Sequence, residues 1–253
     1  MKVGPAYEPA FAIAFVKYFP RRVDADVTLR PDQPDSPKSK QTGWPKGVVL
    51  WDIDGTLVTN RKKRRSLHGE IVRDYFGVVR SAVRETSGFT DYEILRAISP
   101  PEATEVEIKV LLDILDCRYA ETFQAGDLDV LPGVLRALRL AEDLGWHNAL
   151  QTGNTAQRAE VKLESVGLWS YFSERVNSFG GDSSDRSEVV RRAAGLVRPG
   201  IPILLIGDTP RDSEAAVSNG IPMLGVETGA FRQAALRGSG AYVVVTNLVA
   251  GAT

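Results

Sequence analysis

The feature that most constrains the fold is an apolar run that ends at two aspartates. Residues 48–51 read Val-Val-Leu-Trp, and Asp52, Asp54 and Gly55 follow at once. An apolar run without polar alternation is typical of a strand buried on both faces of a parallel sheet. Ligands bind at the carboxyl ends of such strands in open α/β sheets. The two aspartates therefore predict a binding site there, and crowded carboxylates favour a cation beside them.

Composition and charge argue against several classes of function. The 253 residues suffice for a sizeable core, and the formal net charge of -1 gives no global attraction to nucleic acid or anionic lipid. The apolar run 10–16 is far shorter than the about 20 residues that cross a bilayer. Cys117 is the only cysteine, which suits a reducing compartment, so we expect a cytoplasmic protein. With only His68 and His147 available, a histidine-rich metal site is not expected.

The chain divides into three regions by composition and pattern. Residues 1–46 hold half of the fourteen prolines and are predicted to be an N-terminal extension, partly linker or disordered. Segments 47–60 and 128–253 alternate strand and helix patterns, which predicts an α/β, Rossmann-like core domain with a parallel sheet and helices on both faces. Residues 61–127 show only helical spacing, so an all-helical domain is expected as an insert after the first strand.

The expected elements of the second core segment follow from apolar runs, glycines and one proline. Gly145 and Gly167 end two of the helices, and Pro210 suits the first position of another. The predicted helices cover residues 132–144, 156–166, 186–197 and 210–219, and the predicted strands cover 148–151, 175–179, 201–206, 221–226 and 241–245.

Polar residues follow three of these strands and are expected to share one crevice. Asp52 and Asp54 follow the first strand, Thr152 the second, and Asp208 and Asp212 a later one. If the sheet is parallel, all these strand ends lie at the same edge. A group of carboxylates there needs a cation, and carboxylate-rich sites that leave room for water and phosphate oxygens suit Mg²⁺.

This region has two alternative interpretations. An EF-hand calcium loop beginning at Asp52 needs a glutamate at its twelfth position, which here is Lys63. The basic run 61–65 would suit phosphate or nucleic acid, but a solvated helix start explains it as well. We therefore expect neither an EF-hand nor a nucleic-acid partner.

Four stretches together resemble a known family. Residues 52–57 (Asp-Ile-Asp-Gly-Thr-Leu), 151–154 (Gln-Thr-Gly-Asn) and 207–212 (Gly-Asp-Thr-Pro-Arg-Asp) are similar to the first, second and fourth motifs of the haloacid dehalogenase-like hydrolase superfamily. Residues 87–91 (Ser-Gly-Phe-Thr-Asp) resemble a string in caps of its phosphoglycolate phosphatase-like branch, although a helix stop followed by an N-cap explains them too. The resemblance implies that the helical insert is a cap domain of the first type.

The resemblance also implies the roles of the aspartates. Asp52 would attack phosphorus and form an aspartyl-phosphate, and Asp54 would act as general acid and then as general base. Asp52 and Asp208 would hold Mg²⁺ by side chains and Asp54 by its backbone carbonyl. Asp212 would be a further metal ligand or hold metal-bound water.

The same resemblance implies the residues that contact substrate. Thr152 and the backbone N–H groups of Gly153 and Asn154 would bind phosphoryl oxygens. Phe89 and Thr90 are candidates for contact with the leaving group. These assignments predict a catalytic Thr152 and a substrate site shared between the core and the insert.

The third motif departs from its commonest form. The family's usual cation there is lysine, and no lysine lies between Lys162 and Asp208. Arg186 opens the helix that precedes the Asp208 strand, so it is the predicted substitute, and arginine binds phosphate through a charged planar fork. The competing candidates are Arg191, Arg192 and Arg198.

The predicted function is that of a Mg²⁺-dependent phosphatase. Dehalogenases of the superfamily lack an acid at the Asp54 position, and phosphonate hydrolases use a cap lysine that the sequence does not single out. The expected substrate is a small phosphorylated metabolite: phosphoglycolate-like, a sugar phosphate or a nucleotide. A sugar phosphomutase and a catalytically weak, regulatory phosphoryl-binding protein remain as alternatives. No nucleic acid or membrane partner is expected, and the chain would be a monomer or homodimer.

Overall fold

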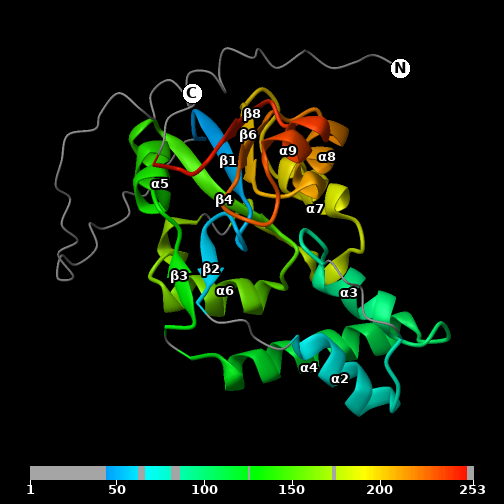
Figure 1. Cartoon of the computed structure of the whole chain (residues 1–253). Helices are drawn as coiled ribbons and strands as arrows, with labels where there is room; N and C mark the ends of the chain where they lie inside the picture. Colours follow the sequence, from blue (N-terminus) through cyan, green and yellow to red (C-terminus); the bar gives the residue numbers. More distant parts are fainter. Residues whose placement is uncertain (1–43, 62–65, 81–85, 125, 173–174, 250–253) are drawn as a thin grey trace, which may run out of the picture.

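A computed structural model describes residues 44–61, 66–80, 86–124, 126–172 and 175–249. The predicted N-terminal extension therefore lies outside the described residues up to position 43, as do positions 62–65 of the basic run. The elements are labelled as in Figure 1.

A six-stranded parallel sheet forms the centre of the molecule (Figure 1). Its order is β5-β4-β1-β6-β7-β8, and every neighbouring pair runs parallel, as the alternating pattern predicted. Leu50 in the central strand pairs in register with Ala149 on one side and Leu205 on the other. The strands are β1 (Gly47–Trp51), β4 (Trp146–Thr152), β5 (Ser178–Phe179), β6 (Ile203–Gly207), β7 (Met223–Val226) and β8 (Val243–Val245).

Helices cover both faces of the sheet, because alternate side chains of each strand point to opposite faces. Val49 and Trp51 of β1 belong to an apolar cluster with α5 and α6, whereas Val48 and Leu50 belong to one with α7 and α8. All four side chains are fully buried. A short further helix, α9, was not predicted. The helices are α5 (Val134–Asp143), α6 (Ala156–Ser165), α7 (Arg186–Gly195), α8 (Pro210–Ser218) and α9 (Gln233–Gly238).

The insert is helical throughout its described elements and has its own apolar cluster. Its helices are α2 (Leu67–Phe76), α3 (Asp91–Ile98) and α4 (Glu105–Thr122). Their buried side chains, among them Ile71, Leu95 and Leu111, pack on one another beyond one end of the sheet (Figure 1). Thr90 and Thr104 cap α3 and α4 by accepting hydrogen bonds from backbone N–H groups of the first turn.

A two-stranded antiparallel ribbon, β2 (Val58–Asn60) with β3 (Leu128–Val130), leads into and out of the insert (Figure 1). This ribbon was not predicted, because three residues are too few to show a strand periodicity. Two single turns of 3₁₀-helix, Trp169–Tyr171 and Gly180–Asp182, complete the described elements.

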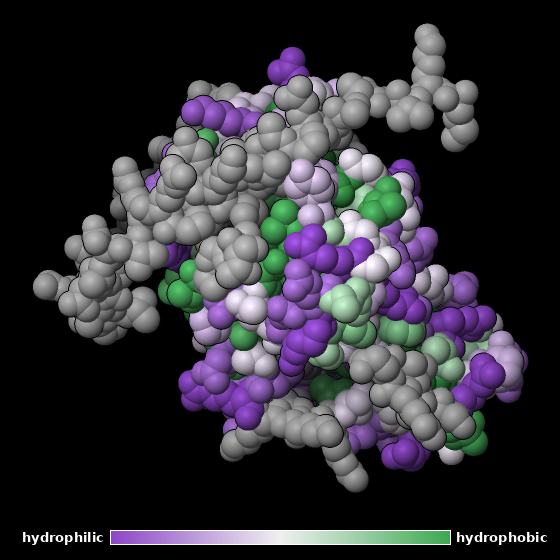
Figure 2. Space-filling view, turned by 45° about the horizontal axis from the view of Figure 1, so that its top comes forward, coloured by the Kyte–Doolittle hydropathy of each residue, from purple (hydrophilic) through white to green (hydrophobic). Residues whose placement is uncertain are grey.

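Exposed apolar side chains are scattered over the surface. Trp44, Val106 and Val217 are among those more than half exposed, and they come from different elements. The face seen in Figure 2 is mostly hydrophilic, with separate green areas. Among the described helices, none combines the length and apolar composition that a bilayer crossing requires.

Candidate functional site

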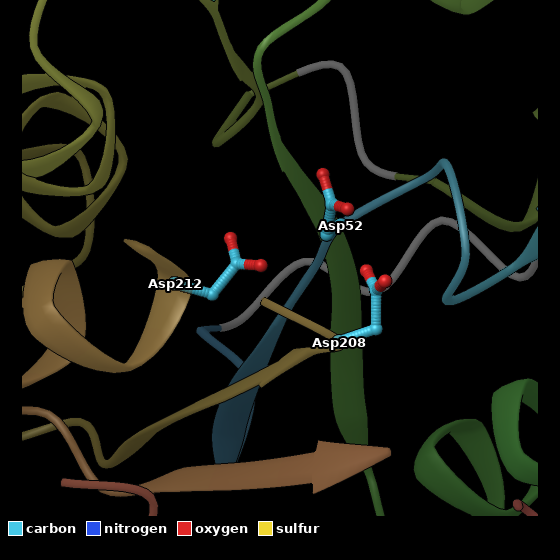
Figure 3. Close-up of side chains that lie close together, drawn as sticks. All are labelled: Asp52, Asp208 and Asp212. Carbon is cyan, nitrogen blue, oxygen red and sulfur yellow. The ribbon is translucent and has the colours of Figure 1, made fainter. Parts of the chain in front are cut away.

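Three neighbouring strands end at polar side chains that meet at one edge of the sheet. Asp52 follows β1, Thr152 ends β4 and Asp208 follows β6. Because β4, β1 and β6 are adjacent and parallel, these ends lie together, as predicted. Asp212 joins them from the first turn of α8. One carboxylate oxygen from each of Asp52, Asp208 and Asp212 lies within 4.8 Å of the others (Figure 3).

Arg186, at the start of α7, places its guanidinium among these carboxylates. Its side chain is 4% exposed, and Nη2 donates to Asp52 Oδ1 at 2.6 Å. Nε and Nη2 also donate to Asp212 Oδ1 at 3.0 and 2.7 Å. Burial raises the pKa of Asp52 to about 7, although the guanidinium opposes that rise. Burial alone would lower the pKa of Arg186, but the Asp212 and Asp52 carboxylates outweigh it and raise that pKa, so the guanidinium stays charged.

The other three arginines considered for this position lie elsewhere. Arg191 and Arg192 pair with Glu188 on the outer face of α7, at 2.6 and 3.1 Å. Arg198 is exposed beyond the end of that helix. Of the four candidates, Arg186 is the one that contacts Asp52.

Asp208 is the least compensated carboxylate of the group. It is buried and accepts a hydrogen bond from the Thr56 hydroxyl at 3.2 Å. Burial, together with the Asp52 and Asp212 carboxylates, raises its pKa to about 9. A Cβ atom at Gly55 or Gly229 would overlap the Asp208 carboxylate, so only glycine leaves room around it at these positions. An added cation would offset this crowding of negative charge, and an all-oxygen, carboxylate-rich donor set is one that Mg²⁺ accepts.

Both oxygens of Asp212 are already used within the protein. Oδ1 accepts from Arg186 and from Gln151 Nε2, the latter at 3.3 Å. Oδ2 accepts from the Thr209 hydroxyl at 2.6 Å and the Thr209 N–H at 3.2 Å, which closes a capping box at the start of α8. These contacts indicate that Asp212 holds Arg186 and the start of α8 in place, rather than coordinating a metal directly.

Asp54, two residues after Asp52, lies in a different environment. Its side chain is 43% exposed and faces the cavity, where Lys162 Nζ lies 2.7 and 2.6 Å from its two oxygens. Asn154 Nδ2 donates to Asp54 Oδ2 at 2.8 Å. Burial alone would raise the pKa of Asp54, but the Lys162 ammonium and the hydrogen bonds from Lys162 and Asn154 outweigh it, so that pKa is lowered.

The second-motif loop lines the cavity with Thr152, Gly153 and Asn154. The Asn154 side chain bridges Asp54, Lys162 and Thr152, whose Oγ1 accepts from Asn154 Nδ2 at 2.8 Å. The N–H of Asn154 also points to Thr152 Oγ1, at 3.3 Å. Gly153 has no room for a side chain, because a Cβ atom there would overlap the carbonyl of Phe89 from the insert.

The two insert residues predicted to contact the leaving group differ in position. Phe89 lines the cavity, and its ring stacks on the Arg211 guanidinium at 3.6 Å. Thr90 is fully buried, donates its hydroxyl to the Ser183 carbonyl at 2.6 Å and caps α3 through Glu93 N–H. The prediction of a substrate contact for Thr90 is therefore corrected, because its hydroxyl is engaged in joining the insert to the core.

Four charged or titratable residues of the site were not predicted as site residues. Asp91 of α3 is buried, accepts from His68 Nε2 at 3.0 Å and pairs with Arg158 of α6. Lys162 lies one turn further along α6, on the buried face that Ala159 and Leu163 share. A lysine on the apolar side of a helix was a signal available in the sequence. The pairing of Asp91 with Arg158 and His68 was not, because it depends on how the insert meets the core.

These residues enclose a cavity of about 430 Å³ between the sheet edge and the insert. The core contributes most of the charged groups already described. The insert contributes His68 and Asp91 and an apolar wall that includes Leu67, Ile94, Leu115 and the ring of Tyr119. The arrangement can hold a phosphoryl group at Asp52 and an organic leaving group beneath the insert.

Comparison with known proteins agrees with this geometry. The family model of haloacid dehalogenase-like hydrolases matches residues 49–226. A phosphoglycolate phosphatase of Rhodobacter capsulatus is 25% identical over 200 residues, which are 75% of this chain and 87% of the relative.

Solved structures share the fold. CbbY from Rhodobacter sphaeroides, in complex with phosphate, has a TM-score of 0.58 at 18% identity, covering 80% of this chain and 94% of its own. A crystal structure described as a predicted phosphatase from Clostridium acetobutylicum has a TM-score of 0.58 at 22% identity, covering 81% and 95%. The family match spans the strand ends that carry Asp52, Thr152 and Asp208. The chain belongs to the haloacid dehalogenase-like hydrolase family.

Proposed function

We propose that the protein is a Mg²⁺-dependent phosphatase that hydrolyses a small phosphate monoester through an aspartyl-phosphate on Asp52. The observation that carries the proposal is the meeting of Asp52, Arg186 and Asp208 at one sheet edge, beneath a cavity closed by the insert. The similarity to a phosphatase of Rhodobacter capsulatus supports the reaction class.

In the first step Asp52 attacks phosphorus and the ester P–O bond breaks. The hydrogen bond from Arg186 Nη2 orients the Asp52 carboxylate. The N–H groups on Nη1 of the same guanidinium suit phosphoryl oxygens. The negative charge of a bound ester favours the protonated form of Asp54, whose pKa is lowered in the free protein, and Asp54 then gives that proton to the departing alkoxide oxygen. Thr152 and the Gly153 backbone, which line the cavity, bind the phosphoryl oxygens.

In the second step Asp54 takes a proton from water as the water oxygen attacks phosphorus. The P–O bond to Asp52 then breaks and inorganic phosphate leaves. The half-exposed side chain of Asp54 faces the cavity, so it can reach both the leaving group and the water.

The metal would be held by the side chains of Asp52 and Asp208 and by the backbone carbonyl of Asp54. When bound, Mg²⁺ supplies positive charge that stabilises the phosphoryl oxygens in the transition state. Asp212 keeps Arg186 in place and holds metal-bound water at most, because both of its oxygens already accept hydrogen bonds.

The test is phosphate release from phosphoglycolate, sugar phosphates, nucleoside monophosphates and 4-nitrophenyl phosphate, with Mg²⁺ and with a chelator, for wild type and Asp52→Asn. We expect Mg²⁺-dependent release that Asp52→Asn abolishes. Isomerised sugar phosphate without release would indicate a mutase instead. Binding of esters without either reaction would indicate a regulatory protein.

A further inference from the structure

Lys162 differs from the other cations of the site because its ammonium already has a full set of acceptors. Its three N–H groups face three oxygens, the two of Asp54 at 2.7 and 2.6 Å and Asn154 Oδ1 at 2.8 Å. An ammonium has three donors and no acceptor. Lys162 therefore acts through its neighbours in this arrangement, rather than by holding a phosphate itself.

Lys162, Asp54 and Asn154 form a closed ring of hydrogen bonds. Asn154 Nδ2 donates to Asp54 Oδ2, and its Oδ1 accepts from Lys162, so the lysine also sets the orientation of the amide. The Lys162 side chain is only 5% exposed and lies on the buried face of α6. Packing thus leaves the ammonium little freedom, and the Asp54 carboxylate has a fixed partner.

The position of Lys162 depends on the insert through α6. The N–H of Thr155, the N-cap of α6, donates to Asp91 Oδ2 at 2.9 Å. Arg158, one turn before Lys162 on the same helix face, pairs with the other oxygen of Asp91. Asp91 belongs to α3 of the insert, so one buried carboxylate fixes both the start of α6 and the turn that precedes Lys162.

A second contact with the insert lies along the same face of α6. The ring of Tyr119, from α4, lies 4.8 Å from the Arg158 guanidinium carbon and 5.8 Å from Lys162 Nζ, measured to the ring centroid. The Thr155 hydroxyl donates to Asp116, also from α4. Two helices of the insert therefore hold the face of α6 that carries Lys162.

We propose that Lys162 is the positioning residue for the acid–base step at Asp54, and that Asp91 brings it into place when the insert is seated on the core. The proposal rests on the proposed function. In it, the Lys162 ammonium holds the Asp54 side chain by hydrogen bonds, while the transferred proton passes from Asp54 to the leaving oxygen. Asn154 keeps the second oxygen of Asp54 oriented.

The test uses the dependence of kcat/KM on the acidity of the leaving group. Aryl phosphates from 2,4-dinitrophenyl through 4-nitrophenyl to phenyl phosphate need increasing help from a general acid. We expect Lys162→Met to stay within about 3-fold of wild type on the dinitrophenyl ester and to lose roughly 10²-fold on the phenyl ester, because general acid catalysis contributes about 10²–10⁴-fold. Lys162→Arg should recover part of that loss.

Two further variants complete the design. Lys109→Met makes the same chemical change at an exposed position of α4 and should leave the whole series unchanged. Asp91→Asn keeps Lys162 but removes the charge that holds Arg158. We expect its kcat/KM to stay near wild type on the dinitrophenyl ester and to fall by roughly 10-fold on the phenyl ester. Circular dichroism and thermal unfolding check that each variant is folded.

The outcomes separate this proposal from the proposed function. An equal loss on all three esters, or no loss, for folded Lys162→Met would overturn the positioning role while leaving the nucleophile in place. If Lys162→Met does not fold, the pattern for Asp91→Asn decides in the same way. Turnover that survives Asp52→Asn would instead contradict the proposed function itself.

Discussion

Asp52 and Asp54 are two residues apart but lie in different groups of polar side chains, the Asp52 cluster and the Asp54 cluster. The two clusters differ in how the negative charge of the carboxylates is balanced. Around Asp52, three buried carboxylates lie together, but the Arg186 guanidinium pairs only with Asp52 and Asp212, and the pKa values of Asp52 and Asp208 are raised. Around Asp54, one carboxylate has a lysine and an amide of its own, and its pKa is lowered.

The two environments therefore differ in whether the protein's own side chains balance the carboxylate charge. Both oxygens of Asp54 have hydrogen-bond partners in the protein itself, which would preorganise this side chain for its proposed acid–base role. The Asp52 cluster carries more negative charge than Arg186 balances, and in the proposed function a divalent cation would balance the rest.

The largest effect is expected from Asp208→Asn. This change removes a buried, poorly compensated carboxylate, so the metal-free protein should become more stable, while activity with Mg²⁺ should fall by roughly 10³-fold because charge stabilisation by the metal is lost. Thermal unfolding with a chelator and kcat with Mg²⁺ measure the two effects. Ser218→Ala, on the exposed end of α8, is the control. If Asp208→Asn is less stable than wild type without metal, the Asp208 carboxylate is not poorly compensated.

The Asp52 and Asp54 clusters should affect the stability of the metal-free protein in different ranges of pH. Asp52 and Asp208 keep their protons in the folded, metal-free protein up to about pH 7 and about pH 9, against a usual pKa of 3.8. Above pH 3.8 the folded state therefore binds more protons than the unfolded state, and stability falls as pH rises toward about 9. Asp54, with its lowered pKa, affects stability only at lower pH, where protonation removes its contribution.

Urea unfolding at several pH values, with a chelator or with Mg²⁺, checks this expectation. Bound Mg²⁺ should flatten the decline, because it competes with protons for the same carboxylates. In Asp208→Asn, the free energy of unfolding should decrease less with rising pH even without the metal. Stability that rises between about pH 5 and about pH 9 in the metal-free protein would show that the Asp52 cluster is better compensated than the structure indicates.

A smaller effect is expected at Thr90, which belongs to neither cluster. Thr90→Ala removes the cap of α3 and the hydrogen bond to the Ser183 carbonyl, so unfolding should become easier by about 1–2 kcal/mol. The KM for 4-nitrophenyl phosphate should change little, since the Thr90 hydroxyl does not line the cavity. Thr90→Ser, which keeps the hydroxyl, should restore stability. A large KM change in Thr90→Ala that Thr90→Ser reverses would return the Thr90 hydroxyl to the substrate site.

The sequence sufficed for the sheet and for the meeting of Asp52, Thr152 and Asp208, because these follow from apolar runs and from the shared edge of parallel strands. It also sufficed to select Arg186, whose place at the start of a helix brings it to Asp52. These are properties of local pattern and topology.

The remaining features depend on tertiary contacts between distant segments. The β2–β3 ribbon and α9 are too short to leave a clear periodicity. Lys162 was overlooked because its partners, Asp54 and Asn154, come from two other segments. Thr90 was assigned to substrate from the family resemblance, although its capping role was an alternative that the sequence offered. Its contact with the Ser183 carbonyl joins residues 93 positions apart, which no local pattern indicates.

The most direct test of Asp52 as the nucleophile is to trap the phosphoryl group on its side chain. Asp54→Asn should still accept phosphoryl from 2,4-dinitrophenyl phosphate, which needs no general acid, but should hydrolyse the intermediate slowly because its base is missing. After acid quenching, peptide mass spectrometry should find one phosphoryl group, on the peptide that contains Asp52 and at that residue. Dinitrophenol release without label, or label on another residue, would contradict Asp52 as the nucleophile.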